Sequence, residues 1–297
     1  MNRHIRRGWA VSDRAGPIST MLRPREDAMA AAERVAALLG LRLGERIRSG
    51  ASGSLILKAT RSDGTTVAVK VDHPARMCLA EHAALAAVGF TPPLLKQGVR
   101  ADVAVTPWIE GARSERGAGL GTTEQVAALL GRLRLAIPPS DALGFDEVVW
   151  GLLRSTVGGD HRLGKTSPID VEVMRSDSEQ LLRAPHQSIL LHGDLTTGNL
   201  VFSVDRAWAI DPRPHRGPLE WDAATWCLWA VPADALPQHV DLLSRIAALD
   251  RRLVASALRF QAAAFLTYRA EVGLDLPPDV LAMASYDLSA DHEGLSR

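Results

Sequence analysis

The feature that most constrains this chain is the spacing of three polar residues that flank two apolar runs. Asp194 comes just after one apolar run, Asn199 lies five residues further on, and Asp211 ends the second run. Phosphoryl transfer from a nucleotide requires a carboxylate that orients the attacking hydroxyl and oxygen ligands that hold magnesium on the phosphates. Asp194 suits the first role as a general base, and Asn199 and Asp211 suit the second. This stretch therefore predicts phosphoryl-transfer chemistry.

Each of these residues alone would also fit a structural role. An aspartate often caps a turn, and Asp211-Pro212 is a common turn start. We favour the catalytic interpretation because His192, Gly193 and the hairpin-like spacing accompany all three residues. We interpret His192 as a residue that orients the backbone by hydrogen bonding, and Asp222 as a helix cap or a brace for the loop. Other histidines have no metal-ligand spacing, so we predict no zinc site.

A glycine- and serine-rich turn upstream could contact phosphates. It spans residues 49–54 between two strand patterns, where backbone amides at glycines can form an anion-binding nest. Ser52, Gly53 and Ser54 are therefore candidate nucleotide-binding residues, with an ordinary hairpin turn as the alternative. No Gly-Lys-Ser/Thr sequence follows, so the turn is not a Walker A loop.

Lys70 has apolar neighbours on both sides in a predicted strand, which is an expensive place for an ammonium group without partners. The following helical pattern contains Glu81. We predict a Lys70–Glu81 ion pair that positions the ammonium on the α- and β-phosphates of a nucleotide. The alternative is a surface lysine on an edge strand and a solvated glutamate.

The composition excludes several other classes of protein. Lys plus Arg equals Asp plus Glu at 34 each, so no whole-molecule field favours nucleic acid or a membrane surface. No apolar run reaches the roughly 18–20 residues that span a bilayer. The Arg-rich start lacks the apolar segment of a signal peptide. The two cysteines, Cys78 and Cys227, form no CxxC pair and suit buried thiols in a reducing compartment. We therefore expect a cytoplasmic protein.

The order of strand and helix patterns predicts an α+β chain with two lobes. An antiparallel sheet with one main helix comes first, and a mainly helical part with a catalytic β-hairpin follows. We divide the chain into a disordered leader (1–24), a nucleotide-binding lobe (25–106), a hinge (107–111) and a catalytic and acceptor-binding lobe (112–297). The expected helices are 27–41, 75–88, 124–135 capped by Thr122 or Thr123, 170–183, 221–231, 238–249 and 251–272. The expected strands are 45–49, 55–60, 66–71, 94–98, 103–106, 189–191, 200–202 and 208–210.

The junction between the two lobes is where a nucleotide base would lie. Backbone groups of Thr106 and Trp108 are candidate hydrogen-bond partners for adenine, by position alone. A tryptophan at such a junction is more often a packing residue.

With these motifs together, the sequence resembles the aminoglycoside phosphotransferase family, whose members share the protein-kinase fold. The similar segments are His192-Gly193-Asp194-Leu195-x-x-Gly198-Asn199 and Ala209-Ile210-Asp211-Pro212-Arg213-Pro214, which look most like the streptomycin 6-kinase and hydroxyurea phosphotransferase branch. The resemblance implies ATP, Mg²⁺ and transfer of the γ-phosphate to a hydroxyl. By motif position it makes Asp194 the base, Asn199 and Asp211 the metal ligands, and Lys70 the phosphate-binding lysine. Thr196-Thr197 departs from the family pattern and leaves the approach to the substrate open.

From this resemblance we predict a monomeric antibiotic kinase that confers resistance, with a streptomycin-type aminoglycoside as acceptor and GTP as an alternative to ATP. Rival acceptors are a viomycin-type peptide antibiotic, hydroxyurea, a sugar and an amino alcohol. A non-catalytic nucleotide-binding protein of the same fold is the alternative from another class. A protein kinase is disfavoured because no Ala-Pro-Glu segment follows Asp211. A cationic acceptor would need acidic side chains, for which the candidates are Asp160, Glu220, Glu271, Asp287, Asp291 and Glu293.

Overall fold

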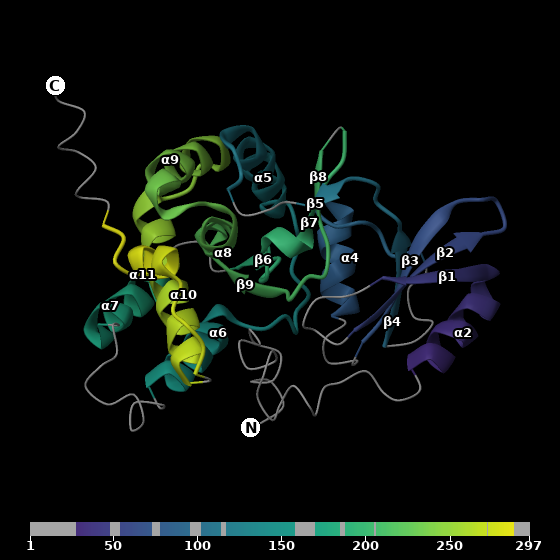
Figure 1. Cartoon of the computed structure of the whole chain (residues 1–297), viewed down its shortest axis with the longest axis horizontal. Coiled ribbons are helices and arrows are strands. Elements are labelled where there is room, and N and C mark those ends of the chain that lie inside the picture. The colour runs from purple at the N-terminus through teal and green to yellow at the C-terminus, as the bar shows by residue number, and fades with distance from the viewer. Residues whose placement is uncertain are drawn as a thin grey trace.

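The computed structural model describes residues 28–47, 54–72, 78–95, 102–113, 117–157, 170–184, 188–204, 206–271 and 273–287. The predicted leader, 1–24, lies outside these residues. The N-terminal part of the chain forms one side of an elongated molecule and the C-terminal part forms the other (Figure 1). The α+β fold class with an antiparallel N-terminal sheet and a helical C-terminal part is confirmed.

The N-terminal sheet is antiparallel, with its four strands in chain order. Side chains alternate between its two faces. In β2 and β3, Leu57, Val67 and Val69 belong to a buried apolar face that packs against the small residues of α2. The opposite face carries Lys70 and is turned to the C-terminal part. The elements are α2 (Ala28–Leu39), β1 (Leu41–Ile47), β2 (Leu55–Arg61), β3 (Thr66–Val71) and β4 (Val103–Pro107).

Two N-terminal predictions need correction. The helix expected over 75–88 is α4 (Leu79–Ala87), and Cys78 before it has a φ of 40°, which a right-handed helix does not allow. The strand expected over 94–98 is not formed at Leu94 and Leu95; instead the Leu95 N–H donates one hydrogen bond to the carbonyl of Val105 (2.8 Å). Residues 96–98 lie outside the described part.

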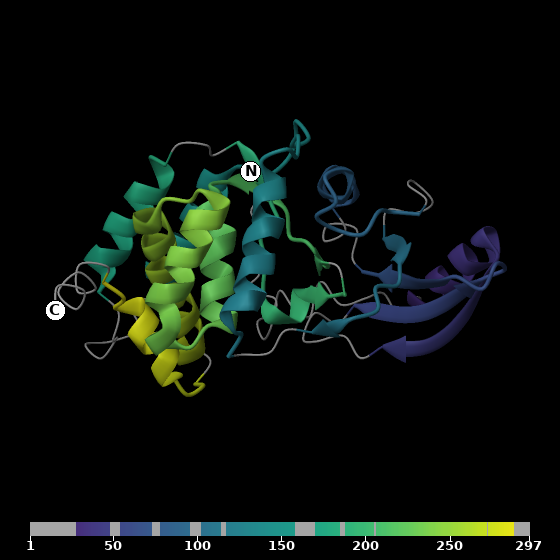
Figure 2. The ribbon, with the colours of Figure 1, turned by 90° about the horizontal axis from the view of Figure 1, so that it is seen from above.

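The C-terminal part is built on helices around one large apolar core (Figures 1 and 2). The helices expected over 170–183, 221–231, 238–249 and 251–272 are confirmed, and Asp170 caps the first of these. The helices over Phe145–Val157 and Pro278–Ala284 were not predicted. The Thr122/Thr123 cap is wrong, because the helix already begins at Leu120. The helices are α5 (Leu120–Leu133), α6 (Phe145–Val157), α7 (Val171–Leu182), α8 (Leu219–Ala230), α9 (Leu236–Ala247), α10 (Arg251–Glu271) and α11 (Pro278–Ala284).

The motif residues Asp194, Asn199 and Asp211 lie in segments that are flanked by short strands. The predicted hairpin is confirmed as β7 (Leu200–Phe202) and β8 (Ala207–Ala209), with Leu200 opposite Ala209. β7 also pairs with β5 (Ala112–Arg113), just after the segment that follows β4. β6 (Ile189–Leu191) pairs elsewhere, with β9 (His215–Gly217).

No helix among the described residues is long and apolar enough to cross a membrane. Within the same residues neither Cys78 nor Cys227 forms a disulfide. Burial raises the pKa of the Cys227 thiol to about 12.

Candidate active site

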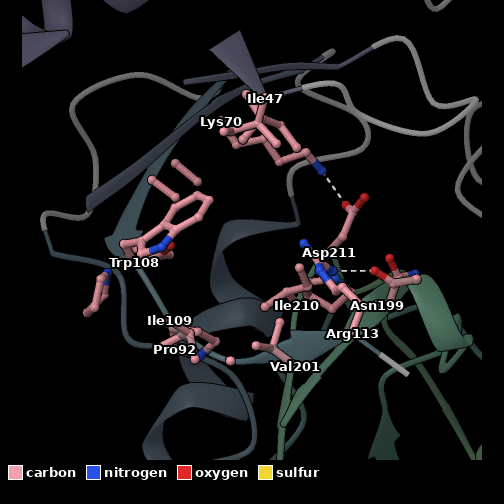
Figure 3. A pocket seen from close by; sticks show the side chains of 18 of the residues that line it. Ile47, Lys70, Pro92, Trp108, Ile109, Arg113, Asn199, Val201, Ile210 and Asp211 are labelled. Atoms are coloured by element: carbon pink, nitrogen blue, oxygen red, sulfur yellow. Dashed lines mark hydrogen bonds and ion pairs between the residues drawn. The ribbon is translucent and has the colours of Figure 1, made fainter. Parts of the chain in front are cut away.

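A cavity of about 570 Å³ lies between the N-terminal sheet and the loops of the C-terminal part (Figure 3). Most of its lining is apolar, and Lys70, Asn199 and Asp211 are among its polar lining residues. This combination suits a ligand with a flat apolar body and an anionic tail. The apolar lining comes from Ile47, Ile56, Ala68 and Ala104 on one side, Val201 and Ile210 on the other, and Trp108 and Ile109 at the connecting segment.

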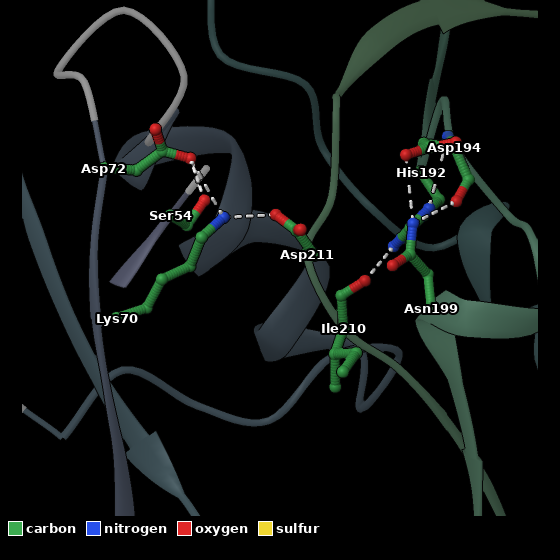
Figure 4. Close-up of polar contacts among 8 residues, drawn as sticks. All are labelled: Ser54, Lys70, Asp72, His192, Asp194, Asn199, Ile210 and Asp211. Atoms are coloured by element: carbon green, nitrogen blue, oxygen red, sulfur yellow. Dashed lines mark hydrogen bonds and ion pairs between the residues drawn. The ribbon is translucent and has the colours of Figure 1, made fainter. Parts of the chain in front are cut away.

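Lys70 reaches across the cavity from β3. Its ammonium forms an ion pair with Asp211 and lies 3.5 Å from Oδ2 of Asp72 (Figure 4). The predicted Lys70–Glu81 pair is not among the ion pairs of the described residues. Glu81 is buried on α4, and it is the next residue, His82, that lines the cavity.

The glycine- and serine-rich turn is described only at its end. Ser52 and Gly53 lie outside the described residues. The hydroxyl of Ser54 is buried and donates to Asp72 Oδ2 (2.7 Å), and Ser54 is not among the residues that line the cavity. Its side chain therefore acts on Asp72, and the predicted phosphate contact of this turn stays a prediction.

Asp211 comes just after β8 and has a φ of 56°, a rare left-handed conformation for a residue other than glycine. Burial alone would raise its pKa, but the positive charges of Lys70 and Arg213 and the hydrogen bond from Lys70 hold the pKa well below its usual range. The carboxylate is thus ionised and faces the cavity, as a metal ligand requires.

Asn199 contacts Asp194, which lies five residues earlier in the chain. Its amide Nδ2 donates to the backbone carbonyl of Asp194 (2.8 Å) and to the carboxylate Oδ2 of Asp194 (3.0 Å). Because both of these bonds use the amide nitrogen, the side-chain oxygen Oδ1 of Asn199 is left for a cation. Asn199 lines the same cavity as Asp211. Asp194 and Asn199 are therefore in contact, and Asn199 and Asp211 line the same cavity, while their catalytic and metal-binding roles stay predictions.

These residues fit magnesium better than a metal held by protein alone. Among the described residues, no group of three or more His, Cys, Asp or Glu side chains could hold a metal ion. Magnesium at a nucleotide needs only one or two protein oxygens, because phosphates and waters complete its shell. The Asn199 carbonyl and the Asp211 carboxylate are such oxygens.

His192 holds the loop in place, as predicted. Its Nε2 contacts the carbonyl of Ile210 (3.0 Å), and its Nδ1 accepts from the backbone N–H of Asp194 (3.3 Å). Full burial lowers the pKa of His192 to about 4, so the ring is neutral and one nitrogen can donate while the other accepts. This neutral histidine joins the start of the catalytic loop to the strand that leads to Asp211.

Asp222 braces the same loop from α8. Its two carboxylate oxygens accept from the backbone N–H groups of His192 (2.7 Å) and Gly193 (2.9 Å). The helix begins at Leu219, so Asp222 is not its cap, and the bracing role is the correct one of the two predicted. Burial raises the pKa of Asp222 to about 7, and the nearby charge of Asp194 also raises it.

The connecting segment corrects the predicted base contacts. Thr106 and Trp108 both line the cavity, but the N–H of Trp108 donates to the carbonyl of Thr66 (3.1 Å) and Thr106 is opposite Ala68 in the ladder. Alternate residues of an antiparallel strand direct their backbone groups to opposite sides. The N–H of Trp108 and the backbone groups of Thr106 therefore face β3, and the carbonyl of Pro107 is directed away from it.

Three residues of the site were missed by the sequence reasoning. Asp72 lies two positions after Lys70, so the strand alternation could have placed both on one face. Arg113 lines the cavity and donates from Nη1 to the carbonyl of Gly198, a contact between distant segments that leaves no local signal. His82 is buried and contacts the carbonyl of Pro92 through Nε2 (2.8 Å).

The acidic residues proposed for a cationic acceptor do not gather at the cavity. Glu220 accepts from the backbone N–H of Asp250 (3.0 Å), Glu271 is exposed at the end of α10, and Asp287 lines a separate cavity beside Asp177 and Arg259. The other three candidates, Asp160, Asp291 and Glu293, lie outside the described residues.

Comparison with solved structures identifies the architecture. The choline kinase LicA from Streptococcus pneumoniae in complex with AMP has 14% sequence identity and a TM-score of 0.59, covering 88% of this chain and 99% of that chain. A choline/ethanolamine kinase family protein from Mesorhizobium loti has 17% identity and a TM-score of 0.61, covering 86% and 90%. The macrolide 2'-phosphotransferase MphH from Brachybacterium faecium has 14% identity and a TM-score of 0.54, covering 84% and 94%. The fold is kinase-like.

At these identities the likeness concerns the kinase-like fold alone. No family model matches the chain, and no curated protein matches it in sequence. The streptomycin 6-kinase branch suggested by the sequence is therefore a resemblance in motifs. Within the kinase-like fold, the cavity lies at the boundary between sheet and helices.

Proposed function

We propose that this protein transfers the γ-phosphoryl group of ATP to a hydroxyl group of a small molecule. The observation that carries the proposal is the convergence of Lys70, Asn199 and Asp211 on one end of an apolar cavity, with Asp194 bonded to Asn199. These residues come from two lobes and three separate segments. A structural role for each one alone would not bring them together around a space for a nucleotide.

The nucleotide base fits between the two apolar walls of the cavity. Its polar edge would pair with the backbone carbonyl of Pro107 and the backbone N–H of Ile109, which both belong to residues of the lining. An adenine presents a donor and an acceptor next to each other and matches this pair. GTP stays open as a second nucleotide, because guanine can use the same N–H with a shifted position.

The phosphates would lie at the polar end. The Lys70 ammonium would bind them, and Asn199 and Asp211 would hold magnesium, which neutralises the charge that develops on the transferred group. The Lys70–Asp211 ion pair has to open when magnesium binds, because the Asp211 carboxylate cannot fully contact both the Lys70 ammonium and the metal. Positioning and electrostatics then supply most of the rate.

Asp194 would act on the acceptor. Its carboxylate orients the acceptor hydroxyl in line with the γ-phosphate and takes the hydroxyl proton as the new O–P bond forms and the bond to ADP breaks. Asn199 holds Oδ2 of Asp194 (3.0 Å), and the His192 and Asp222 bonds keep the loop from moving. This is a pre-organised base on a braced loop.

For the acceptor we propose an antibiotic hydroxyl, with a streptomycin-type aminoglycoside first, because the motif segments resemble that branch. The likeness to a macrolide 2'-phosphotransferase supports an antibiotic of some kind. An amino alcohol is the second candidate, because choline kinase structures share the fold along most of this chain. Both classes carry a cationic nitrogen near a hydroxyl.

Nucleotide binding and acceptor choice can be tested in two steps. First, saturating ADP with Mg²⁺ should raise the thermal midpoint, because a ligand that binds only the native state stabilises it. Second, ADP release should rise with one member of a panel of aminoglycosides, macrolides, choline and ethanolamine. If no nucleotide shifts the thermal midpoint, the proposal is contradicted, because it requires nucleotide binding. Acceleration by choline but by no antibiotic would replace the antibiotic with an amino alcohol.

A further inference from the structure

We propose that Asp72 is a positioning residue for Lys70, held in place by Ser54. This role rests on the proposed function, in which Lys70 binds the nucleotide phosphates. The carboxylate of Asp72 stays with the ammonium when Asp211 turns to magnesium, so it takes the place that the sequence had predicted for Glu81.

The contacts form a short chain from the glycine- and serine-rich turn to the cavity (Figure 4). The Ser54 hydroxyl donates to Asp72 Oδ2 (2.7 Å), and the same oxygen lies 3.5 Å from Nζ of Lys70. The backbone N–H of Asp72 donates to the carbonyl of Asp102 (3.0 Å), which fixes the end of β3. Each member of the chain is therefore held by a neighbour.

Burial distinguishes the carboxylate of Asp72 from that of Asp211. The side chain of Asp72 is 0% exposed, whereas those of Lys70 and Asp211 are 17% and 21% exposed. A carboxylate that far from water is costly unless charged and hydrogen-bonding partners compensate for it. Lys70 and Ser54 are such partners. Asp72 therefore keeps its interaction with the ammonium inside the protein, while Asp211 faces the cavity and a metal.

The strand geometry explains how Lys70 can contact Asp72 and nucleotide phosphates at the same time. Lys70 and Asp72 are two residues apart in an extended segment, so their side chains leave the same face of the sheet. An ammonium has three donors and no acceptor. With the ammonium in an ion pair with Asp72, donors remain for phosphate oxygens once the contact with Asp211 opens. Asp72 thereby limits the directions that the flexible lysine can take.

The test compares Asp72→Asn and Ser54→Ala with a matched control, Asp63→Asn. Asp63 is an exposed aspartate in the β2–β3 turn, at the opposite end of the same two strands, where it accepts from the N–H of Thr65 (2.8 Å). Isothermal titration with ADP and Mg²⁺ gives the affinity, and urea unfolding gives the stability of each variant. We expect Asp72→Asn to weaken ADP about tenfold, which is the scale of a hydrogen bond to a charged group. Ser54→Ala should weaken it about threefold, and Asp63→Asn should leave it within twofold.

A double-mutant cycle separates positioning from general destabilisation. In a Lys70→Met background, Asp72→Asn should cause no further loss of ADP affinity, because the residue that it positions is gone. A wild-type affinity in Asp72→Asn, or a loss that adds fully to that of Lys70→Met, would overturn the role. If Asp72→Asn does not fold, the Ser54→Ala result decides, and an unchanged affinity there overturns it. Failure of the wild-type protein itself to bind ADP would instead overturn the proposed function and this role with it.

Discussion

Gly193 lies between His192 and Asp194 with a φ of 77°, and a Cβ atom built on it would come within 2.0 Å of the carbonyl oxygen of Arg213. An L side chain rarely adopts this backbone conformation, and the neighbouring atom is backbone that cannot move away alone. Gly193→Ala should therefore destabilise the loop by more than about 1–2 kcal/mol and lower kcat at least about tenfold. Urea unfolding and steady-state kinetics measure the two effects.

Gly131→Ala is the control for that variant. Gly131 lies inside α5 with nothing within 4 Å of its added Cβ, so alanine should stabilise the helix by about 0.5–1 kcal/mol without a change in kcat. Equal kinetics in the two variants would mean that the conformation of Gly193 has no importance for the catalytic loop.

The candidate site residues could be chosen from the sequence, but the residues that contact them could not. Lys70, Asp194, Asn199 and Asp211 are recognisable because their types and spacing follow from what phosphates and magnesium need. The partners of Lys70 depend on which carboxylates the fold brings close, and here those are Asp72 and Asp211 rather than Glu81. The backbone contacts of Thr106 and Trp108 depend on strand register, which is a property of β3 and β4 together.

At the scale of elements, three helices meet at one buried polar cluster. Thr123 on α5 contacts Nδ1 of His239 on α9 (2.7 Å) and accepts from Nε1 of Trp226 on α8 (3.3 Å). Thr123→Val keeps the shape of the side chain but leaves two buried partners unsatisfied. We expect a loss of about 1–3 kcal/mol in the free energy of unfolding.

Thr122→Val is the matched control, one residue earlier and only half-buried. It should change the free energy of unfolding by less than about 0.5 kcal/mol, as surface substitutions usually do. Chemical denaturation of both variants measures the difference. Similar losses in the two variants would contradict the importance of this helix junction.

The elements that the sequence predicted are those with long apolar patterns, such as α8, α9 and α10. The helix α6 was missed because a pair of valines, Val148 and Val149, and Gly151 weaken its helical pattern. The helix α11 is only seven residues long and begins at the second of two consecutive prolines, a sequence that looks like a loop. The three-residue strand β9 exists because it pairs with the distant β6, and no local pattern reports such a pairing.

For the whole molecule, buried ionisable groups set the pH dependence of stability. Burial lowers the pKa values of His192 and His215 to about 4, from the ordinary histidine value of 6.5. Their unfolded forms bind protons first, so stability falls as the pH drops from 6.5 toward 4. Asp222 has a pKa raised to about 7 from 3.8, so its native form binds the proton first and opposes this fall in the same window.

Asp222→Asn removes the opposing group. Between pH 5 and 6 the free energy of unfolding of this variant should rise with pH more steeply than that of the wild type, by about 1.4 kcal/mol per pH unit for the one proton removed. Urea unfolding across this range measures the slopes, which are independent of any constant loss that the substitution causes. Parallel curves would show that Asp222 does not titrate at these pH values.

The two-lobed arrangement as a whole could be predicted because the strand-rich and helix-rich segments are separate in the sequence. The cavity between the two parts could not be predicted, because it forms only when both parts pack. For the same reason the sequence could not show that Glu220 and Asp287 lie away from this cavity.

Transfer of label from [γ-³²P]ATP to the acceptor panel, by the wild type and by Asp194→Asn, tests whether this protein is a phosphotransferase with Asp194 as its base. Asparagine keeps the size of the side chain but cannot take a proton, so the transfer rate should fall at least about 100-fold, the scale of general-base catalysis. ADP affinity should stay within twofold, because Asp194 is not among the residues that line the nucleotide cavity. A labelled product from the wild type, lost in Asp194→Asn, is the predicted result. No labelled product from the wild type with any acceptor, or an equal rate in both proteins, would contradict the account.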